Sequence, residues 1–276
     1  MKKFSVKSFQ IAKDENRKIT MLTAYDYSMA KILDSAGIDS ILVGDSLGMV
    51  FQGHDSTLTV TIDDIIYHTR AVMRGVSRAL VIADMPFLSY HISKEDAIRN
   101  AGRIIKEGGA EAVKIEGGVY FADTIRAIVQ SQIPVMGHIG LTPQSVNTFG
   151  GFKVQGKNPE SARQIIEDAK TLEKSGVFAI TLEGVPEELA KQITESIRIP
   201  VIGIGAGRYC DGQVLVVNDM LRMYNDFVPQ FVKQFAQLNV EIVSAVQSYI
   251  SGVQQGNFPA PEHTYDSDPE ISEKLF

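Results

Sequence analysis

Short apolar runs alternate with longer amphipathic stretches along most of this chain, and that alternation restricts the fold more than any other feature of the sequence. Each run is only four or five residues long and nearly continuous, which is typical of parallel strands covered on both faces. We predict eight strands, at Ile19–Thr23, Ser40–Val43, Leu80–Ala83, Ala112–Ile115, Pro134–Gly137, Phe178–Leu182, Pro200–Ile204 and Gln213–Val217.

Helical patterns fill the intervals between the apolar runs. The stretch after Thr61 places its apolar residues on one face, and Ser93 and Asp96 have the spacing of a helix N-cap. The predicted helices are Asp26–Ala36, Thr61–Val76, Ser93–Lys106, Asp123–Gln130, Pro159–Lys174 and Pro186–Ser196. Eight strand–helix units in about 220 residues favour a (β/α)8 barrel, and an open doubly wound sheet is the alternative.

The barrel predicts a single domain over residues 1–276, because barrels of this kind typically take about 250 residues. Within it we expect a short N-terminal extension before the first strand and one long amphipathic helix at Val228–Ser251. From about residue 252 the sequence is polar and carries Pro259, Pro261 and Pro269. We therefore expect a C-terminal tail that lies on the surface.

Charge and cysteine content restrict the partners and the compartment. Acidic residues outnumber basic ones by 33 to 27, which argues against general nucleic-acid binding because that binding depends on phosphate neutralisation. No apolar stretch approaches the roughly 18 residues that a membrane span needs. The single cysteine, Cys210, has no partner for an internal disulfide, and the first residues lack the apolar core of a secretory signal. We therefore expect a cytoplasmic protein that binds neither nucleic acid nor membrane.

Ionisable residues close five consecutive predicted strands, most of them beside a glycine. They are Asp45, Asp84, Glu116, His138 and Glu183. In (β/α)8 barrels the active site lies at the carboxyl ends of the strands, whereas other positions serve stability. A carboxylate that closes a strand can equally be the N-cap of the next helix. Five such residues in a row favour a functional site.

The carboxylates of Asp45, Asp84 and Glu116 are expected to converge at one rim of the barrel. Two carboxylates about 4 Å apart repel each other by roughly 4 kcal/mol at an effective dielectric near 20, so three of them need a cation or protons. Ligands that are all oxygen suit Mg²⁺ better than Zn²⁺. The alternative is that the three carboxylates are solvated separately.

Lys114 and Glu116 lie two residues apart on one strand, so both side chains point to the same face. A buried lysine is costly unless it is paired, and we expect Lys114 to pair with the carboxylates or to bind a substrate oxygen. A purely structural ion pair and a Schiff base are the alternatives. Across the mouth, Leu182 and Gly184 flank Glu183, and such apolar surroundings make a carboxylate a stronger base. His138 is expected as a neighbour of this site.

The chain resembles the ketopantoate hydroxymethyltransferase family at these residues. The resemblance spans about residues 20–265 and includes every ionisable strand end described above. Two mild departures, at Arg222 and at Thr148-Phe149, do not touch the expected site. The segments that carry the resemblance include ADMPFLSY (83–90), AEAVKIEGG (110–118), PVMGHIGLTPQSV (134–146), TLEGVP (181–186) and PVIGIGAGRYCDGQVLVVNDML (200–221).

The resemblance implies a barrel of the phosphoenolpyruvate/pyruvate-binding type. It also implies an enzyme that transfers a hydroxymethyl group from 5,10-methylenetetrahydrofolate to 3-methyl-2-oxobutanoate, in pantothenate biosynthesis. By the same resemblance, Asp45 and Asp84 hold Mg²⁺, and Glu116 is a third ligand, directly or through water. Ser46 and Lys114 bind the oxo acid beside the two aspartates, and Glu183 is the general base.

The resemblance further implies a homo-oligomer, commonly a decamer built from dimers. Two alternatives remain for the function. One is another metal-dependent oxo-acid aldolase or carbon–carbon lyase on the same barrel, which would need no folate. The other is a non-catalytic protein that binds a metal or an oxo acid.

Overall fold

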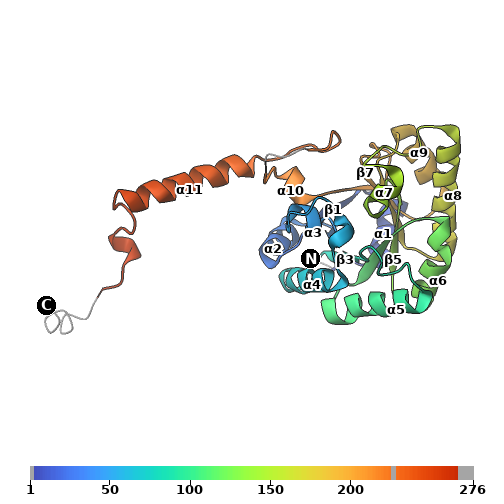
Figure 1. Cartoon of the computed structure of the whole chain (residues 1–276), viewed down its shortest axis with the longest axis horizontal. Helices are drawn as coiled ribbons and strands as arrows, with labels where there is room; N and C mark the ends of the chain where they lie inside the picture. The colour runs from blue at the N-terminus through green and yellow to red at the C-terminus, as the bar shows by residue number, and fades with distance from the viewer. Residues whose placement is uncertain (1–2, 225–227, 267–276) are drawn as a thin grey trace. The chain divides into compact units, whose positions relative to one another are not determined.

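The strands close into a barrel, as the alternation in the sequence predicts. The computed structural model describes residues 3–224 and 228–266, and within them eight parallel strands pair in chain order until the last returns to the first (Figure 1). This arrangement confirms the (β/α)8 barrel and excludes the open sheet. The strands are β1 (Ile19–Thr23), β2 (Ser40–Val43), β3 (Leu80–Asp84), β4 (Ala112–Glu116), β5 (Val135–Gly140), β6 (Ala179–Glu183), β7 (Val201–Ile204) and β8 (Gly212–Leu215).

Several strand boundaries differ from the prediction in a way that matters for the site. β3, β4 and β6 each run one residue further, so that Asp84, Glu116 and Glu183 are the last residues of their strands. β5 continues to Gly140, and His138 therefore lies inside the strand rather than at its end. β8 begins one residue earlier than predicted and stops at Leu215.

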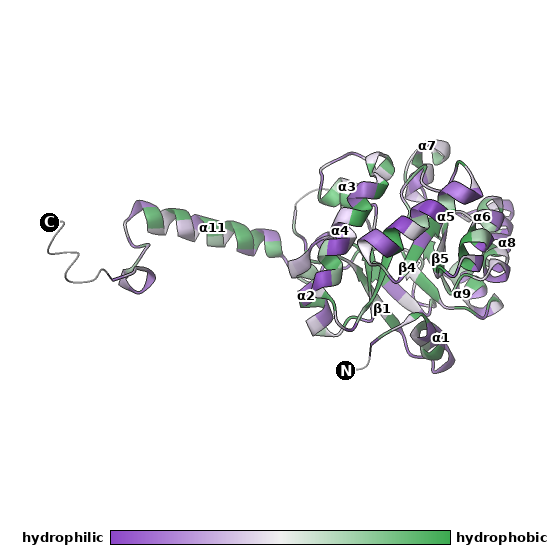
Figure 2. Ribbon diagram, turned by 90° about the horizontal axis from the view of Figure 1, so that it is seen from below, coloured by the Kyte–Doolittle hydropathy of each residue, from purple (hydrophilic) through white to green (hydrophobic). Residues whose placement is uncertain are grey.

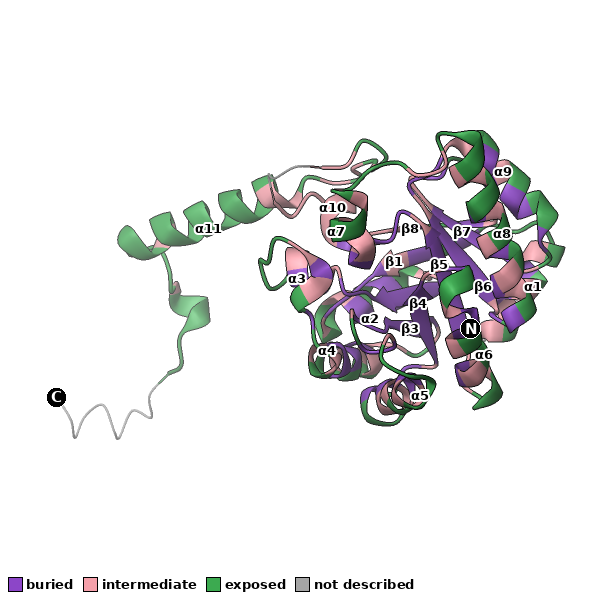
Figure 3. Ribbon diagram, turned by 45° about the vertical axis from the view of Figure 1, so that its right-hand side comes forward, coloured by how far each residue is buried: buried purple, intermediate pink, exposed green. Residues whose placement is uncertain are grey.

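Long helices follow the strands and cover the outside of the barrel. Local signals set their ends: the Thr61 side chain accepts a hydrogen bond from the Asp64 backbone N–H at the start of one, and Gly37, with a φ of 91°, ends another. Figure 3 shows the buried strands inside a ring of helices whose outer faces are exposed. The helices are α2 (Tyr27–Ala36), α4 (Ile62–Gly75), α5 (Lys94–Arg103), α6 (Ala122–Gln130), α8 (Pro159–Ser175) and α9 (Glu187–Ser196).

An N-terminal helix that the sequence analysis did not predict closes one end of the barrel. This helix is α1 (Val6–Asp14), which Figure 2 shows at one end of the strands. It buries Phe9 and Ala12, and the Phe4 ring packs against the Phe9 ring. The three side chains belong to one apolar cluster with strand residues, most of which come from the amino-terminal halves of the strands. The opposite end of the barrel, where the strands finish, is therefore the end left for a site.

Short helical turns occupy the connections of the barrel. Those after β2, β4 and β5 lie at the carboxyl ends of the strands, where they surround the ionisable residues described below. The short elements of the barrel unit and its border are α3 (Leu47–Val50), η1 (Thr57–Thr59), η2 (Ile104–Gly108, a π-turn that ends α5), η3 (Val119–Phe121), η4 (Pro143–Ser145), α7 (Val146–Phe149) and α10 (Val217–Met220).

The chain divides into two compact units. The first comprises residues 1–217 and 229–232 and contains the whole barrel, and the second comprises residues 218–228 and 233–276. The predicted helix from Val228 is wrong at its start, because Pro229 begins a turn and the Phe231 ring packs against Gly205 of the barrel. Helix α11 (Leu238–Gln254) instead begins ten residues later.

Among its described residues, the second unit lacks the buried apolar contacts of the first. No residue of α11 is buried, and the described part of the predicted tail, up to residue 266, contains the short turn η5 (Pro261–His263), whereas Pro269 lies outside the described residues. The single domain over the whole chain, with a surface tail from about residue 252, therefore stays a prediction. Among the described residues, no helix is long and apolar enough to cross a membrane.

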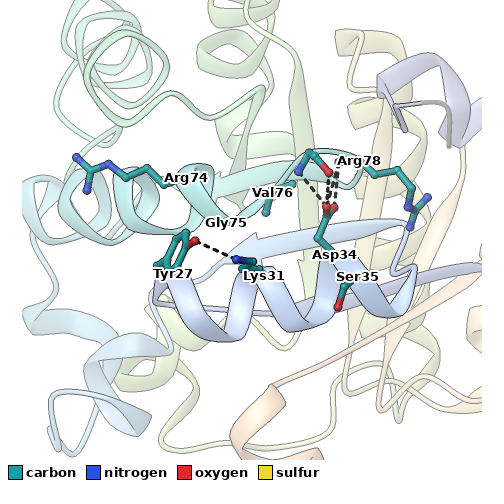
Figure 4. A pocket seen from close by; sticks show the side chains of 9 residues that line it. Tyr27, Lys31, Asp34, Ser35, Arg74, Gly75, Val76 and Arg78 are labelled. Atoms are coloured by element: carbon teal, nitrogen blue, oxygen red, sulfur yellow. Dashed lines mark hydrogen bonds between the residues drawn. The ribbon is translucent and has the colours of Figure 1, made fainter. Parts of the chain in front are cut away.

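A cleft of about 610 Å³ lies where α2 meets the turn between α4 and β3 (Figure 4). Its wall is held by the carboxylate of Asp34, which accepts hydrogen bonds from the backbone N–H groups of Ser77 (2.9 Å) and Ala79 (2.7 Å). The turn precedes β3, so the cleft is at the amino-terminal end of the strands. That end of a (β/α)8 barrel generally serves stability rather than catalysis.

Candidate active site

Three carboxylates from neighbouring strands meet at the carboxyl end of the barrel, as the sequence predicts. Asp45 directly follows β2 across Gly44, and Asp84 and Glu116 are the last residues of β3 and β4. All three are almost fully buried, with exposed fractions of 2 to 3%. The backbone N–H of Asp45 donates a hydrogen bond to Asp84 Oδ2 at 3.0 Å, which ties the first two carboxylates together.

Strand register places a buried lysine beside these carboxylates. Lys114 is the register partner of Asp84 in the β3–β4 pair, and its Nζ atom lies 2.9 Å from Asp84 Oδ1. Burial by itself would lower the pKa of Lys114, but the charges of Asp84 and Glu116 outweigh burial and raise that pKa above its ordinary value. Lys114 is therefore a cation that neutralises part of the cluster, and an ion pair is part of its role.

The cluster carries more negative charge than Lys114 balances. Burial, and then the charges of Asp84 and Glu116, raise the pKa of Asp45 well above its usual range. Burial also raises the pKa of Asp84, although Lys114 opposes that effect. Among the described residues, no cationic side chain lies within ion-pair distance of Asp45. An additional cation would therefore be stabilised beside this residue.

His138 connects the cluster to Glu183. It is the register partner of Glu116, and its Nδ1 atom lies 3.3 Å from Glu116 Oε1 and 3.1 Å from Lys114 Nζ. On its other side, Nε2 lies 3.2 Å from Glu183 Oε2. Nδ1 accepts from Lys114 when the ring is neutral and donates toward Glu116 when the ring is protonated, but it cannot do both. In either state Nε2 carries a proton, and although this nitrogen is close to Glu183 it forms no well-aligned hydrogen bond.

Protonation of these groups is set by their mutual contacts. Burial and Lys114 act to lower the pKa of His138, but Glu116 and Glu183 outweigh them and raise it to about 9. Burial would raise the pKa of Glu116, yet the hydrogen bond and charge of His138 hold it below its usual range. Glu183 therefore faces an imidazole on one side, in addition to the apolar neighbours that the sequence predicts.

The close packing at Glu183 depends on a glycine. Gly140 is its register partner in the β5–β6 pair and has a φ of 92°. A Cβ atom at Gly140 would lie 2.3 Å from the backbone oxygen of Glu183, which is closer than any real contact. A side chain at this position would push the end of β6 away, so Gly140 keeps Glu183 at its place at the mouth.

The remaining predicted residue, Ser46, lies at the edge of the cluster. Its Oγ atom shares a hydrogen bond of 2.9 Å with the Tyr25 hydroxyl rather than with a carboxylate. Ser46 is half-buried, at the start of α3, and so can still reach a small molecule bound beside Asp45. The structure thus gathers all seven predicted residues at one end of the barrel.

Two uncharged residues that the sequence analysis missed also belong to the site. Gln144, in η4 after β5, donates from Nε2 to Asp45 Oδ2 at 2.8 Å. Tyr90 donates from its hydroxyl to Gln144 Oε1 at 2.7 Å. Both are buried. The sequence signal for both residues is that they follow predicted strands, in the loops at the carboxyl ends. A search for ionisable residues at strand ends does not detect Gln144 or Tyr90.

The three carboxylates are oxygen ligands of the kind that suits a hard divalent cation, although in this structure they form hydrogen bonds and an ion pair with other groups of the chain. Within residues 3–224 and 228–266, no three His, Cys, Asp or Glu side chains are already arranged as metal ligands. The reason is that Asp84 bonds to Lys114 and to the Asp45 backbone, while Glu116 Oε2 accepts from the Gln144 backbone N–H. Three buried carboxylates outnumber their two cationic partners, Lys114 and the protonated His138, and provide the oxygen ligands that Mg²⁺ requires.

Comparison with known proteins identifies relatives of this chain. The family model for ketopantoate hydroxymethyltransferase matches residues 3–261. A protein of Clostridium beijerinckii named 3-methyl-2-oxobutanoate hydroxymethyltransferase is 60% identical over 274 residues, which cover 99% of this chain and 100% of that protein.

Solved structures share the fold at low sequence identity. Phosphonopyruvate hydrolase, in complex with oxalate and Mg²⁺, has a TM-score of 0.62 and 14% identity, with 99% of this chain and 94% of that chain covered. A 2,3-dimethylmalate lyase of the PEP mutase/isocitrate lyase superfamily has a TM-score of 0.59 and 16% identity, with 98% and 93% covered. These likenesses show that the chain shares the barrel fold of these structures.

Proposed function

The chain belongs to the ketopantoate hydroxymethyltransferase family, and we propose that it carries out the family's reaction with Mg²⁺ and 5,10-methylenetetrahydrofolate, through an enolate. It is an enzyme that transfers a hydroxymethyl group to 3-methyl-2-oxobutanoate, in pantothenate biosynthesis. The observation that carries the proposed mechanism is the buried cluster of Asp45, Asp84 and Glu116, linked through His138 to Glu183.

The carboxylate cluster supports the binding of a cation and an oxo acid side by side. Asp45 and Asp84 would hold Mg²⁺ directly, and Glu116 would do so directly or through water. Ser46 and Lys114 would bind the oxo acid, because a hydroxyl and an ammonium group suit its carboxylate and keto oxygens. When bound, the cation would supply positive charge where the negative charge of the enolate develops.

Glu183 is proposed as the general base. The hydrogen on C3 of the substrate is weakly acidic because the ketone is adjacent, so a positioned carboxylate can remove it. The contact at 3.2 Å between His138 Nε2 and Glu183 Oε2 supports a carboxylate held in a fixed orientation. The deprotonated C3 carbon then forms a bond to the one-carbon unit of the folate, whose two C–N bonds break. One water molecule supplies the oxygen of the new hydroxymethyl group. The folate nitrogens and this oxygen take up the protons of that water and the proton removed from C3, so that ketopantoate and tetrahydrofolate leave.

We also propose a cytoplasmic homo-oligomer, with a decamer as the form that the family resemblance implies. Cys210 is the single cysteine and is buried, which is consistent with a reducing compartment because the chain forms no internal disulfide. The apolar residues on α11 support an oligomer, since no residue of that helix is buried.

Formation of the carbon–carbon bond tests this proposal directly. The purified protein is incubated with 3-methyl-2-oxobutanoate and 5,10-methylenetetrahydrofolate, with and without Mg²⁺, and ketopantoate is followed by NMR. We expect product only when both the folate and the divalent cation are present. Product formed without folate would favour a different aldolase or lyase, and product at full rate in excess EDTA would contradict the metal.

A further inference from the structure

Gln144 links the ends of three strands through hydrogen bonds. Its backbone N–H donates to Glu116 Oε2 at 2.9 Å, and its side-chain Nε2 donates to Asp45 Oδ2 at 2.8 Å and to the Met85 backbone oxygen at 3.0 Å. The residue exposes 5% of its surface. A single neutral residue therefore contacts both of the outer carboxylates of the cluster, Asp45 through its side chain and Glu116 through its backbone.

The orientation of the Gln144 amide is determined by its partners. Both acceptors of Nε2 are oxygens, so the nitrogen must face Asp45 and Met85. The Tyr90 hydroxyl, 2.7 Å from Oε1, occupies the other side of the amide and is also 3.1 Å from the Glu116 backbone oxygen. Tyr90 is 1% exposed. The amide therefore cannot flip without leaving buried donors and acceptors unpaired.

We propose that Gln144 is a positioning residue of the cation site, and this inference rests on the function proposed above. Its amide occupies one oxygen of Asp45, and no hydrogen bond from the described residues reaches the other oxygen, Oδ1. The backbone N–H of Gln144 restrains Glu116 in the same way. Two buried carboxylates that would otherwise repel each other are thus held at one spacing by neutral donors.

This arrangement predicts an effect on cation affinity rather than on chemistry. Groups that hydrogen-bond to metal ligands orient them, and their removal typically costs roughly 10–100-fold in metal affinity. Gln144 does not contact Glu183 or Lys114 through any hydrogen bond of the described structure. Once enough cation is present to saturate the site, the reaction of the bound substrate should therefore proceed at a rate near that of the unaltered protein.

The test is Mg²⁺ titration by calorimetry of the full-length Gln144→Met variant. Methionine has a similar length and no hydrogen-bonding amide, while the backbone bond to Glu116 is kept. We expect the dissociation constant to rise roughly 10–100-fold. The matched control is Gln164→Met, because the Gln164 amide also donates to an aspartate, Asp168 Oδ1 at 3.2 Å, on the exposed face of α8. We expect the control to bind Mg²⁺ as the unaltered protein does.

A kinetic measurement separates positioning from a merely structural role. For Gln144→Met, the Mg²⁺ concentration at half-maximal activity should rise by the same factor, with kcat near that of the unaltered protein. Tyr90→Phe, which keeps the ring but releases one side of the amide, should shift the same midpoint by a smaller factor. If Gln144→Met does not fold, the result for Tyr90→Phe decides the question.

The outcomes distinguish this inference from the proposed function. If the unaltered protein binds Mg²⁺ and the variants bind it equally well, Gln144 has no positioning role and the proposed function stands. If stability falls in Gln144→Met while the Mg²⁺ midpoint does not move, its role is structural and the inference is wrong. If the unaltered protein binds no divalent cation, both the proposed cation site and the role of Gln144 are overturned.

Discussion

Lys114 changes what the removal of Asp84 is expected to do. Repulsion between carboxylates alone, roughly 4 kcal/mol at 4 Å, would suggest that Asp84→Ala stabilises the metal-free protein. The structure predicts the opposite effect on the stability of the metal-free protein, because Asp84 pairs with Lys114 at 2.9 Å and accepts a hydrogen bond from the Asp45 backbone N–H. Removing one partner of a buried ion pair typically costs about 3–5 kcal/mol.

We therefore predict that Asp84→Ala loses Mg²⁺-dependent turnover and also lowers the free energy of unfolding of the metal-free protein by about 3 kcal/mol. Urea unfolding in EDTA measures the second effect, and the ketopantoate assay measures the first. Asp55→Ala, at an exposed position, is the control and should change neither. Unaltered activity of Asp84→Ala at low Mg²⁺ would show that Asp84 is not a ligand.

Glu183→Gln separates binding from proton transfer. The amide is nearly isosteric but does not accept a proton at neutral pH, so turnover should fall by roughly 10²–10⁴-fold with little change in substrate binding. Exchange of the C3 hydrogen of 3-methyl-2-oxobutanoate with deuterated water, followed by NMR, isolates this step. Glu188→Gln, exposed on α9, is the matched control. If Glu183→Gln exchanges the hydrogen as fast as the unaltered protein, the base is another residue, with His138 the next candidate.

The charged part of the site could be predicted from the sequence, and the neutral part could not. Asp84, Glu116 and Glu183 follow apolar runs, so their common end of the barrel follows from the parallel strand pattern. Gln144 and Tyr90 lie in loops, and no periodicity specifies where a loop turns back. The contact of Gln144 with Asp45 joins residues 99 positions apart, which only the closed barrel brings together.

At the scale of elements, one carboxylate connects helix α2 to the turn before β3. Asp34 accepts hydrogen bonds from the backbone of Ser77 and Arg78 and from the Ser77 hydroxyl (Figure 4). The Ala79 backbone N–H donates to the same carboxylate. Burial acts to raise the pKa of Asp34, but these hydrogen bonds outweigh it and lower the pKa from 3.8 to about 2. The ionised carboxylate is therefore stabilised by folding, and the stabilisation is present above pH 3.8.

This linkage predicts how Asp34→Asn depends on pH. The shift from 3.8 to about 2 corresponds to about 2 kcal/mol, present at pH 7 and lost as the pH falls from about 4 through 2. Urea unfolding at several pH values should therefore show the unaltered protein and the variant converging in acid. Asp26→Asn is the control, because Asn caps a helix as well as Asp does. A stability difference that stays constant from pH 7 to pH 3 would contradict the prediction.

The alternation of apolar runs and amphipathic stretches predicted the strands and helices of the barrel. Tertiary contacts, by contrast, determine where the helices α1 and α11 begin. Helix α1 has a short apolar face, and its burial of Phe9 becomes understandable only once the barrel presents an open end. The apolar pattern from Val228 continues into α11, which suggested one helix. Packing of Phe231 against Gly205 overrides that local preference, as tertiary contacts often do.

At the scale of the whole molecule, α11 presents an apolar surface that the described residues of the chain leave exposed. Glu241 is its single charged residue, and none of its 17 residues is buried. Each apolar side chain that becomes buried at an interface contributes about 1.5–3 kcal/mol, so this helix has a strong tendency to associate. Its exposed apolar residues recur mostly three or four positions apart and are Val240, Ile242, Val243, Val246, Tyr249, Ile250 and Val253.

We therefore predict that the protein is a homo-oligomer and that α11 contributes to its interface. Light scattering of the full chain at micromolar concentration should give a mass above that of a dimer. The double variant Val246→Glu with Ile250→Glu places charges in the apolar stripe and should shift the protein toward smaller species, because a buried unpaired charge is costly. Ser248→Glu, on the opposite side of the same helix, should leave the mass unchanged. A monomeric mass for the unaltered protein would contradict the oligomer, and an unchanged mass for the double variant would exclude α11 from the interface.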